Sequence, residues 1–180
     1  MRHAGLRAVL LLAAIASAAP ARGEVTDRAP NGFTVKVVLE VAAPPETVYA
    51  SLVHDVGQWW DKDHTYSGDA KNLSIIAAPG GCFCEAMPAG GVQHGSVVYV
   101  APGRMLRIAG SLGPLQEAGV SGAMTWLMEK SGTGSKLTFT YSAGGYYPGG
   151  LDTLAPIVDN VLTHQAQLLK EYSEKVARTR

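Results

Sequence analysis

One apolar stripe near the C-terminus constrains the fold more than any other feature of this 180-residue chain. Its members recur at helical spacing: Leu154, Val158, Val161, Leu162, Gln165, Leu168, Leu169, Tyr172 and Val176. This spacing predicts one long amphipathic helix. Asp152 can cap its start, and Pro156 is tolerated because it falls in the first turn. A long helix with one apolar face requires one apolar surface to cover.

The preceding segment supplies strands for that surface. Residues 33–41 alternate between apolar and polar, which predicts a half-buried strand, and Pro45 then opens one or two short helices that end near Trp60. Apolar runs between turn residues predict about six more strands, over Leu73–Ala77, Cys82–Met87, Val92–Val100, Arg104–Leu112, Ala123–Glu129 and Lys136–Ala143. Their hairpin-length connections favour antiparallel pairing. The predicted fold class is α+β: a curved antiparallel sheet of about seven strands wrapped around the C-terminal helix.

The first 23 residues read as a signal peptide. Arg2 and Arg7 provide a basic start, residues 8–15 are apolar, and small residues follow, so we expect cleavage between about residues 18 and 23. The mature chain, residues 24–180, is then a single domain. No cysteine lies near the cleavage region to carry a lipoprotein anchor, and no later apolar run is long enough to cross a bilayer. We therefore expect a periplasmic or secreted protein that is not integrated in a membrane.

The charge pattern argues against nucleic acid as a partner. The chain has 15 basic and 15 acidic residues, and loss of the leader removes three arginines, Arg2, Arg7 and Arg22. The remaining basic residues are scattered singly, without the stripe that a nucleic-acid-binding surface requires. The sequence also lacks a phosphate loop and a dinucleotide fingerprint, and no cofactor is predicted.

Three stretches of the sequence resemble a known superfamily. They read APPETVYASLV over residues 43–53, VGQWWD over residues 56–61 and PGGCFCE over residues 79–85. They are similar to the helix opening, the tryptophan after it and the glycine pair of the START-related ligand-binding superfamily, also called SRPBCC. The resemblance covers residues 33–177 and is nearest to the activators of heat-shock ATPases and to the polyketide cyclases or dehydratases. It implies the helix-grip fold, and its motifs specify the fold better than the activity.

The resemblance implies that a small apolar or amphipathic molecule binds in a cavity between the sheet and the C-terminal helix. Residues from several predicted elements are expected to line it: Trp60, Tyr66, Phe83, Glu85, Trp126, Tyr141, Tyr146 and Leu162. Tyr146 lies in the glycine-rich loop 143–150, which suits either a cavity lid or an ordinary turn. Two other functions stay open: an enzyme similar to the polyketide cyclases, and a partner-protein-binding module similar to the ATPase activators.

Two residues are candidates for acid or base catalysis if the protein is an enzyme. With Phe83 directed into the core, strand alternation turns Glu85 to the same side, where desolvation raises the pKa of a carboxyl group and suits it to proton transfer. Alternatively, Glu85 reaches solvent or Arg107 at the end of the strand. His64 lies near the expected cavity mouth, where it either binds the polar end of a ligand or bonds to backbone in a loop.

The two cysteines, Cys82 and Cys84, share the outward face of one strand. In a flat strand their Cα atoms lie about 6.6 Å apart, close to the upper limit for an unstrained disulfide. A disulfide and two free thiols are therefore both open. A metal site could combine the cysteines with His64 and His94, but the spacing matches no standard motif, and no metal is predicted. Simple alternation places His94 on one strand face with Val92, Ser96, Val98 and Val100.

Overall fold

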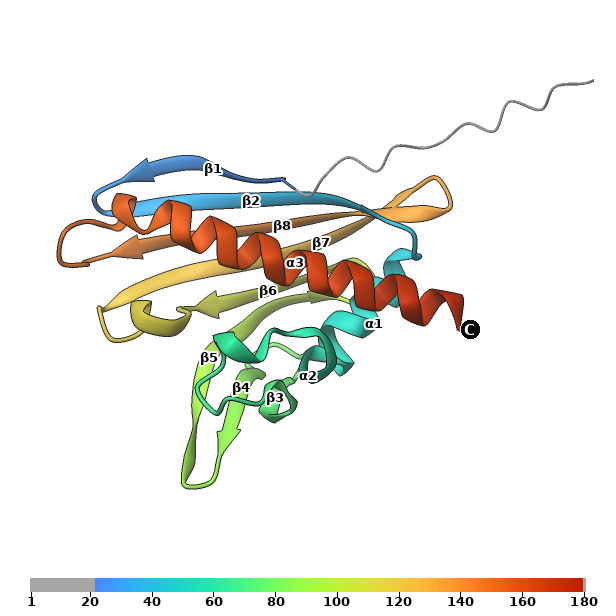
Figure 1. Ribbon diagram of the computed structural model, residues 1–180, viewed down its shortest axis with the longest axis horizontal. Coiled ribbons are helices and arrows are strands. Elements are labelled where there is room, and N and C mark those ends of the chain that lie inside the picture. Colours follow the sequence, from blue (N-terminus) through green and yellow to red (C-terminus); the bar gives the residue numbers. More distant parts are fainter. Residues whose placement is uncertain (1–21, 180) are drawn as a thin grey trace, which may run out of the picture.

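The computed structural model describes residues 22–179, which form one antiparallel sheet with a long helix lying across one face (Figure 1). The sheet contains eight strands in the order β1-β2-β8-β7-β6-β5-β4-β3. Their bounds are Arg22–Ala29 (β1), Gly32–Val41 (β2), Leu73–Ile75 (β3), Cys82–Met87 (β4), Gly90–Ala101 (β5), Met105–Gly110 (β6), Val120–Ser131 (β7) and Gly134–Gly145 (β8).

The helices occur in two segments of the chain, one after β2 and one after β8. Two short helices, α1 (Pro45–His54) and α2 (Val56–Trp59), follow β2, and the long helix α3 (Ala155–Arg178) ends the described chain. Single 3-10 turns lie at Lys62–His64 (η1), Ala70–Asn72 (η2), Gly113–Leu115 (η3) and Leu151–Thr153 (η4). The predicted α+β class and helix-grip arrangement are confirmed, because the curved sheet wraps around α3 (Figure 1). Within residues 22–179, no helix combines the length and apolarity needed to cross a membrane.

Besides shifts of a few residues at several strand ends, two features differ from the sequence predictions. The sequence predicts no strand before Phe33, yet β1 pairs with β2 at the edge of the sheet. Val25 packs against the core, but its neighbours in β1 are mostly exposed, so the alternation that would predict a strand is missing. Helix α3 begins at Ala155 with Leu154 at the N-cap position, so Asp152 lies in η4 and does not cap it. Residues 1–21 of the predicted signal peptide lie outside the described residues.

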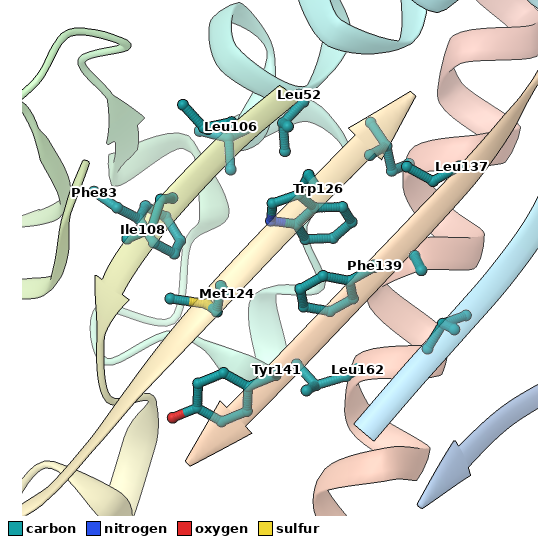
Figure 2. Close-up of a cluster of buried hydrophobic side chains, with 14 of the residues drawn as sticks. Leu52, Phe83, Leu106, Ile108, Met124, Trp126, Leu137, Phe139, Tyr141 and Leu162 are labelled. Atoms are coloured by element: carbon teal, nitrogen blue, oxygen red, sulfur yellow. The ribbon is translucent and has the colours of Figure 1, made fainter. Parts of the chain in front are cut away.

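The core follows regular alternation on the central strands β2, β7 and β8. Their inward side chains are buried: Val35, Val37, Leu39, Met124, Trp126, Met128, Leu137, Phe139 and Tyr141. Trp126 and Phe139 face each other in the β7–β8 register, and their rings stack with centroids 3.7 Å apart (Figure 2). Because each large apolar side chain contributes about 1.5–3 kcal/mol when buried, this packed layer is what holds α1 and α3 against the sheet.

Strand β5 interrupts the alternation twice. Opposite β4 the register passes from Gly95 to Gln93 and leaves His94 as an extra residue, and opposite β6 it leaves Val98 extra in the same way. Such bulges bend a strand and re-aim its side chains. His94 and Gly95 are consequently both buried, while Val98 is exposed. The predicted common face of His94, Val92, Ser96, Val98 and Val100 is therefore wrong, because strict alternation does not hold in β5.

Candidate functional site

A cavity of about 530 Å³ lies between the N-terminal half of α3 and the bulged side of the sheet. It is lined by Trp60, Asp63, His64, Thr65, Tyr66, Leu73, Phe83, His94, Leu112, Gly113, Pro114, Leu115, Glu117, Tyr141, Tyr147, Leu154, Ile157, Val158, Val161 and Leu162. Most of these side chains are apolar or aromatic. Small-molecule sites usually enclose about 300–1,000 Å³ behind such walls, so the cavity has the size and surface for a small, mainly apolar molecule.

The structure brings together most of the residues predicted from the sequence to line the cavity. Trp60, Tyr66, Phe83, Tyr141 and Leu162 all contribute to the wall. Trp126 does not, because it is packed under Phe139 in the core and is only 2% exposed. Tyr146 is also absent from the wall and is 75% exposed, whereas its neighbour Tyr147 faces the cavity. Glu85 is not a lining residue either, because His94 lies between it and the cavity.

Several lining residues lie outside the set predicted from the sequence. Leu112 and Leu115 line the cavity from the η3 loop, whose sequence suits either a cavity lid or an ordinary turn. The lining residues that were missed include Leu154, at the N-cap position of α3, and Val158 and Val161 within the helix. The helical stripe contained the signal for these three residues, since its N-terminal half faces the cavity. Its C-terminal half faces packed core, where Leu169 is fully buried. Periodicity alone does not separate the two halves, because both are apolar.

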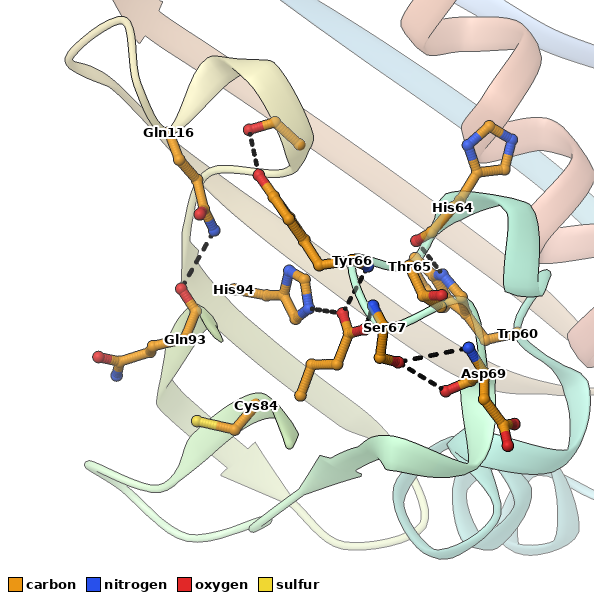
Figure 3. A network of polar contacts seen from close by, with 12 residues as sticks. Trp60, His64, Thr65, Tyr66, Ser67, Asp69, Cys84, Gln93, His94 and Gln116 are labelled. Atoms are coloured by element: carbon orange, nitrogen blue, oxygen red, sulfur yellow. Dashed lines mark hydrogen bonds and ion pairs between the residues drawn. The ribbon is translucent and has the colours of Figure 1, made fainter. Parts of the chain in front are cut away.

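Glu85 sits on the inner face of β4 and is 1% exposed. Its carboxylate accepts hydrogen bonds from the backbone N–H of Tyr66 at 3.1 Å and from the backbone N–H of Ser67. The third partner is His94, whose Nε2 lies 3.0 Å from Glu85 Oε2 (Figure 3). Glu85 therefore points inward, as expected from Phe83, and its carboxylate is bound by these three donors and not by solvent or Arg107.

The expected direction of the pKa shift is wrong for Glu85. Burial does raise the pKa of the carboxyl group, but the hydrogen bonds from Ser67, Tyr66 and His94 stabilise the charged form and together outweigh burial, so the pKa lies below its ordinary value. The carboxylate is consequently ionised at neutral pH. It is suited to holding its three donors in place and poorly suited to donating a proton.

His94 faces the cavity from the first bulge of β5. Burial lowers the pKa of its ring, and the neighbouring Glu85 carboxylate raises it by a smaller amount, so the net shift is downward and the ring is neutral at pH 7. Its ring packs beside Phe83, with centroids 4.9 Å apart, and beside Tyr66 at 6.0 Å. A neutral imidazole backed by a fixed carboxylate is thus presented to an aromatic cavity.

The loop that closes one side of the cavity is tied to its surroundings by hydrogen bonds. Asp61 caps η1 by accepting from the Asp63 backbone N–H at 3.0 Å, and its own backbone N–H donates to Gln165 Oε1 on α3 at 3.0 Å. The Tyr66 hydroxyl donates to the Gly113 carbonyl at 3.1 Å, which links this loop to η3 (Figure 3). His64 is exposed at the cavity mouth and accepts, through its backbone carbonyl, a hydrogen bond from Trp60 Nε1.

Cys82 and Cys84 form a disulfide on the half-buried outer side of β4. Their Cα atoms lie 5.4 Å apart, shorter than the spacing of a flat strand, and the neighbouring register shift shows that the strand pair is not flat here. In the disulfide the sulfurs are not thiolate ligands, and His94 Nε2 is occupied by Glu85. Residues 22–179 contain no cluster of three or more His, Cys, Asp or Glu side chains that could hold a metal ion.

Comparison with known proteins identifies the fold. A putative uncharacterised protein from Rhizobium leguminosarum superposes with a TM-score of 0.60 at 17% identity, covering 87% of this chain and 99% of that one. The fold is the helix-grip fold. The Aha1 dimer from Colwellia psychrerythraea matches with a TM-score of 0.57 at 17% identity, over 78% of this chain and 96% of that one. The di-domain ARO/CYC StfQ of the steffimycin biosynthetic pathway gives 0.55 at 14% identity, over 83% and 53%.

These likenesses are structural and not matched by sequence. No protein-family model and no curated protein matches the chain. At identities of 14–17% the solved structures share the helix-grip architecture with this chain and nothing finer. The helix-grip scaffold is therefore established, and function depends on the side chains of the cavity.

Proposed function

We propose that this protein binds a small apolar or amphipathic molecule in the cavity between α3 and the sheet, in the periplasm or outside the cell. The observation that carries the proposal is the cavity of about 530 Å³ with its mainly apolar and aromatic wall. Each Å² of apolar surface withdrawn from water contributes about 25 cal/mol. An apolar molecule of matching size is therefore stabilised in this cavity without any specific polar contact.

The compartment is inferred from the N-terminal sequence. Residues 1–23 have the basic start, apolar stretch and small residues of a signal peptide. The Cys82–Cys84 disulfide supports the same location, because disulfides persist in oxidising compartments and are rare in the cytosol.

A neutral fluorescent probe tests the binding proposal. We expect N-phenyl-1-naphthylamine to bind with one-to-one stoichiometry and to gain fluorescence in the apolar cavity. Val158 is a half-buried lining residue, so Val158→Trp should fill the cavity and weaken probe binding by about tenfold or more. The matched control is Val38→Trp, the same replacement on the outer face of β2, where Val38 is 41% exposed. Probe binding that is absent, or equal in the two variants, contradicts the proposal.

The second candidate function is an enzyme similar to the polyketide cyclases or dehydratases, with Glu85 or His64 in proton transfer. The buried Glu85–His94 pair favours it, because coupled titratable groups beside a cavity are common in active sites. Any effect of Glu85 on a bound molecule would pass through His94, which separates it from the cavity. Glu85→Gln should then lower turnover of a bound carbonyl compound while binding is kept, with His64→Gln as the parallel test at the mouth. A native protein without turnover excludes this function, and turnover that survives both substitutions excludes Glu85 and His64 from the proton transfer.

A further inference from the structure

His94 and Tyr141 are the buried residues of the cavity wall that carry a polar side-chain atom. The His94 side chain is 6% exposed, whereas Asp63, His64, Tyr66 and Glu117 are exposed residues at the mouth. The Tyr141 hydroxyl is directed at the Gly110 carbonyl at 3.5 Å. Thr65 and Tyr147 also line the cavity but are only half-buried, and the Thr65 hydroxyl donates to the Lys62 carbonyl at 2.7 Å. The imidazole is thus the polar group best placed to contact a molecule deep in the cavity.

The hydrogen bond to Glu85 fixes which ring nitrogen carries the proton. The carboxylate is ionised and can only accept, so the nitrogen that faces it at 3.0 Å, Nε2, must be the N–H donor. The ring is neutral, so it has one N–H and no second one. Nδ1 is therefore a bare acceptor with a lone pair.

Nδ1 has no hydrogen-bond partner in the described part of the chain, and it reaches open space. The buried side-chain atoms without a partner within residues 22–179 are Ser51 Oγ and Gln165 Nε2. Nδ1 of His94 also has no partner but is not one of these fully buried atoms. Because His94 lines the cavity, we take Nδ1 to be open to the cavity. A free lone pair that faces an apolar enclosure needs a donor from the molecule that enters, because an unpaired polar group loses stabilisation there.

We infer that His94 Nδ1 is the polar anchor of the cavity and accepts a hydrogen bond from the hydroxyl group of a neutral amphipathic ligand. This inference rests on the proposed binding function and adds the class of ligand. A hydroxyl group is a donor that costs little to bury once it is paired. Ligands that carry the same apolar body but only an acceptor, such as an ether, leave Nδ1 unpaired.

The charges at the cavity exclude the most obvious competitor, a carboxylate-ended ligand. The described lining contains two acidic residues, Asp63 and Glu117, and no lysine or arginine. At the mouth, Lys62 is already paired with Asp63 at 2.7 Å. Deeper in the cavity a ligand carboxylate would meet the lone pair of His94 with no lysine or arginine in the wall to balance its charge, and burying an unpaired charge is costly. The site therefore selects the alcohol over the acid of the same chain length.

Three matched probes test the inference: decan-1-ol, its isomer 1-methoxynonane, and decanoate. Titrations follow tryptophan fluorescence, because Trp60 is part of the wall. One hydrogen bond between neutral groups is worth about a two- to tenfold difference in affinity. We expect decan-1-ol to bind about three- to tenfold more tightly than 1-methoxynonane and decanoate to bind most weakly. In His94→Phe, which keeps an aromatic ring and removes both nitrogens, the alcohol and the ether should bind equally.

The outcomes separate failure of the anchor from failure of the binding function. Equal binding of alcohol and ether to the native protein, tighter binding of decanoate, or an alcohol preference that survives in His94→Phe overturns the anchor while the cavity still binds apolar molecules. If none of the three probes binds, the proposed function fails and the anchor fails with it.

A nuclear magnetic resonance measurement on the native protein removes any dependence on how His94→Phe folds. A long-range ¹H–¹⁵N spectrum of the His94 ring should show Nε2 protonated and Nδ1 bare. Addition of decan-1-ol should shift the Nδ1 resonance towards the value of a hydrogen-bonded nitrogen, and 1-methoxynonane should leave it in place. A ring protonated at Nδ1, or a Nδ1 signal that both probes move equally, overturns the anchor.

Discussion

The two halves of the sheet, strands β2, β7 and β8 and strands β4 and β5, differ in regularity. On β2, β7 and β8 the register is unbroken, alternation is strict, and inward residues such as Trp126 and Phe139 stack without leaving space. On β4 and β5 the register shifts, a disulfide joins residues two apart, and two polar side chains, Glu85 and His94, turn inward. The cavity lies beside this second half, strands β4 and β5. The regular half of the sheet therefore supplies stability, while the irregular half is less closely packed and forms the binding site.

The largest contrast should come from removing one tryptophan on each side. Trp126→Ala opens a hole in packed core and should lower the free energy of unfolding by about 3–5 kcal/mol. Trp60→Ala enlarges a cavity that already exists and removes the hydrogen bond from Trp60 Nε1 to the His64 carbonyl, and we expect a loss of about 1–2 kcal/mol. Urea denaturation measures both. Decan-1-ol binding should weaken in Trp60→Ala and persist in folded Trp126→Ala; the reverse pattern would show that Trp126, and not Trp60, lines the binding site.

Glu85→Gln should have the next largest effect. The amide cannot satisfy two backbone N–H groups and the His94 N–H as the carboxylate does, so the free energy of unfolding should fall by about 1–3 kcal/mol. Glu40→Gln is the matched control, because Glu40 is exposed on β2. The same urea midpoint for the two variants would show that the buried network contributes nothing.

Stability should also fall as the pH is lowered from 7 to 5, and His94 should be the main cause. The pKa of His94 is lowered in the folded protein, so the unfolded chain takes up a proton near pH 6.5 before the folded protein does. The stabilisation is therefore complete above pH 6.5 and is lost as the pH falls through the folded pKa. Below pH 4.5 the lowered pKa of Glu85 also makes stability fall as the pH decreases, because the unfolded chain binds the proton first. The melting temperature, plotted against pH between 7 and 5, should fall less steeply for His94→Phe than for the native protein. Parallel slopes would contradict the role given to His94.

Loss of the disulfide should have the smallest effect on global stability. A cross-link between residues two apart closes a very short loop and removes little chain entropy, so Cys82→Ser with Cys84→Ser should cost about 1–2 kcal/mol. The backbone next to Phe83 and Glu85 should relax, however, and the alcohol preference at His94 should change more than the urea midpoint. Dithiothreitol should reproduce this result in the native protein and leave the double variant unaffected.

The regular half of the fold could be predicted from the sequence because each of its signals is local. The alternation in residues 33–41 and the stripe from Leu154 to Val176 each express one period, and the structure confirms both the strand β2 and the helix α3. Strand β1 was not predicted, because an edge strand needs few apolar residues and Val25 alone does not make an alternating pattern.

The site could be predicted only in part, because it depends on departures from a period. The inward placement of Glu85 followed from Phe83, but its donors Tyr66 and Ser67 come from a loop whose path no pattern specifies. His94 turns inward through a bulge, which adds one residue to β5 and leaves no mark in the composition of the strand. The neighbouring Tyr146 and Tyr147 show the same limit, since only a fixed loop decides which ring faces the cavity.

Native mass spectrometry of the protein with decan-1-ol tests the central claim, that one amphipathic molecule occupies the cavity beside α3. The native protein and Val38→Trp should each add the mass of one decan-1-ol molecule and no more, and Val158→Trp should remain unliganded. Equal occupancy of Val158→Trp, or several molecules bound to each protein, would contradict the claim.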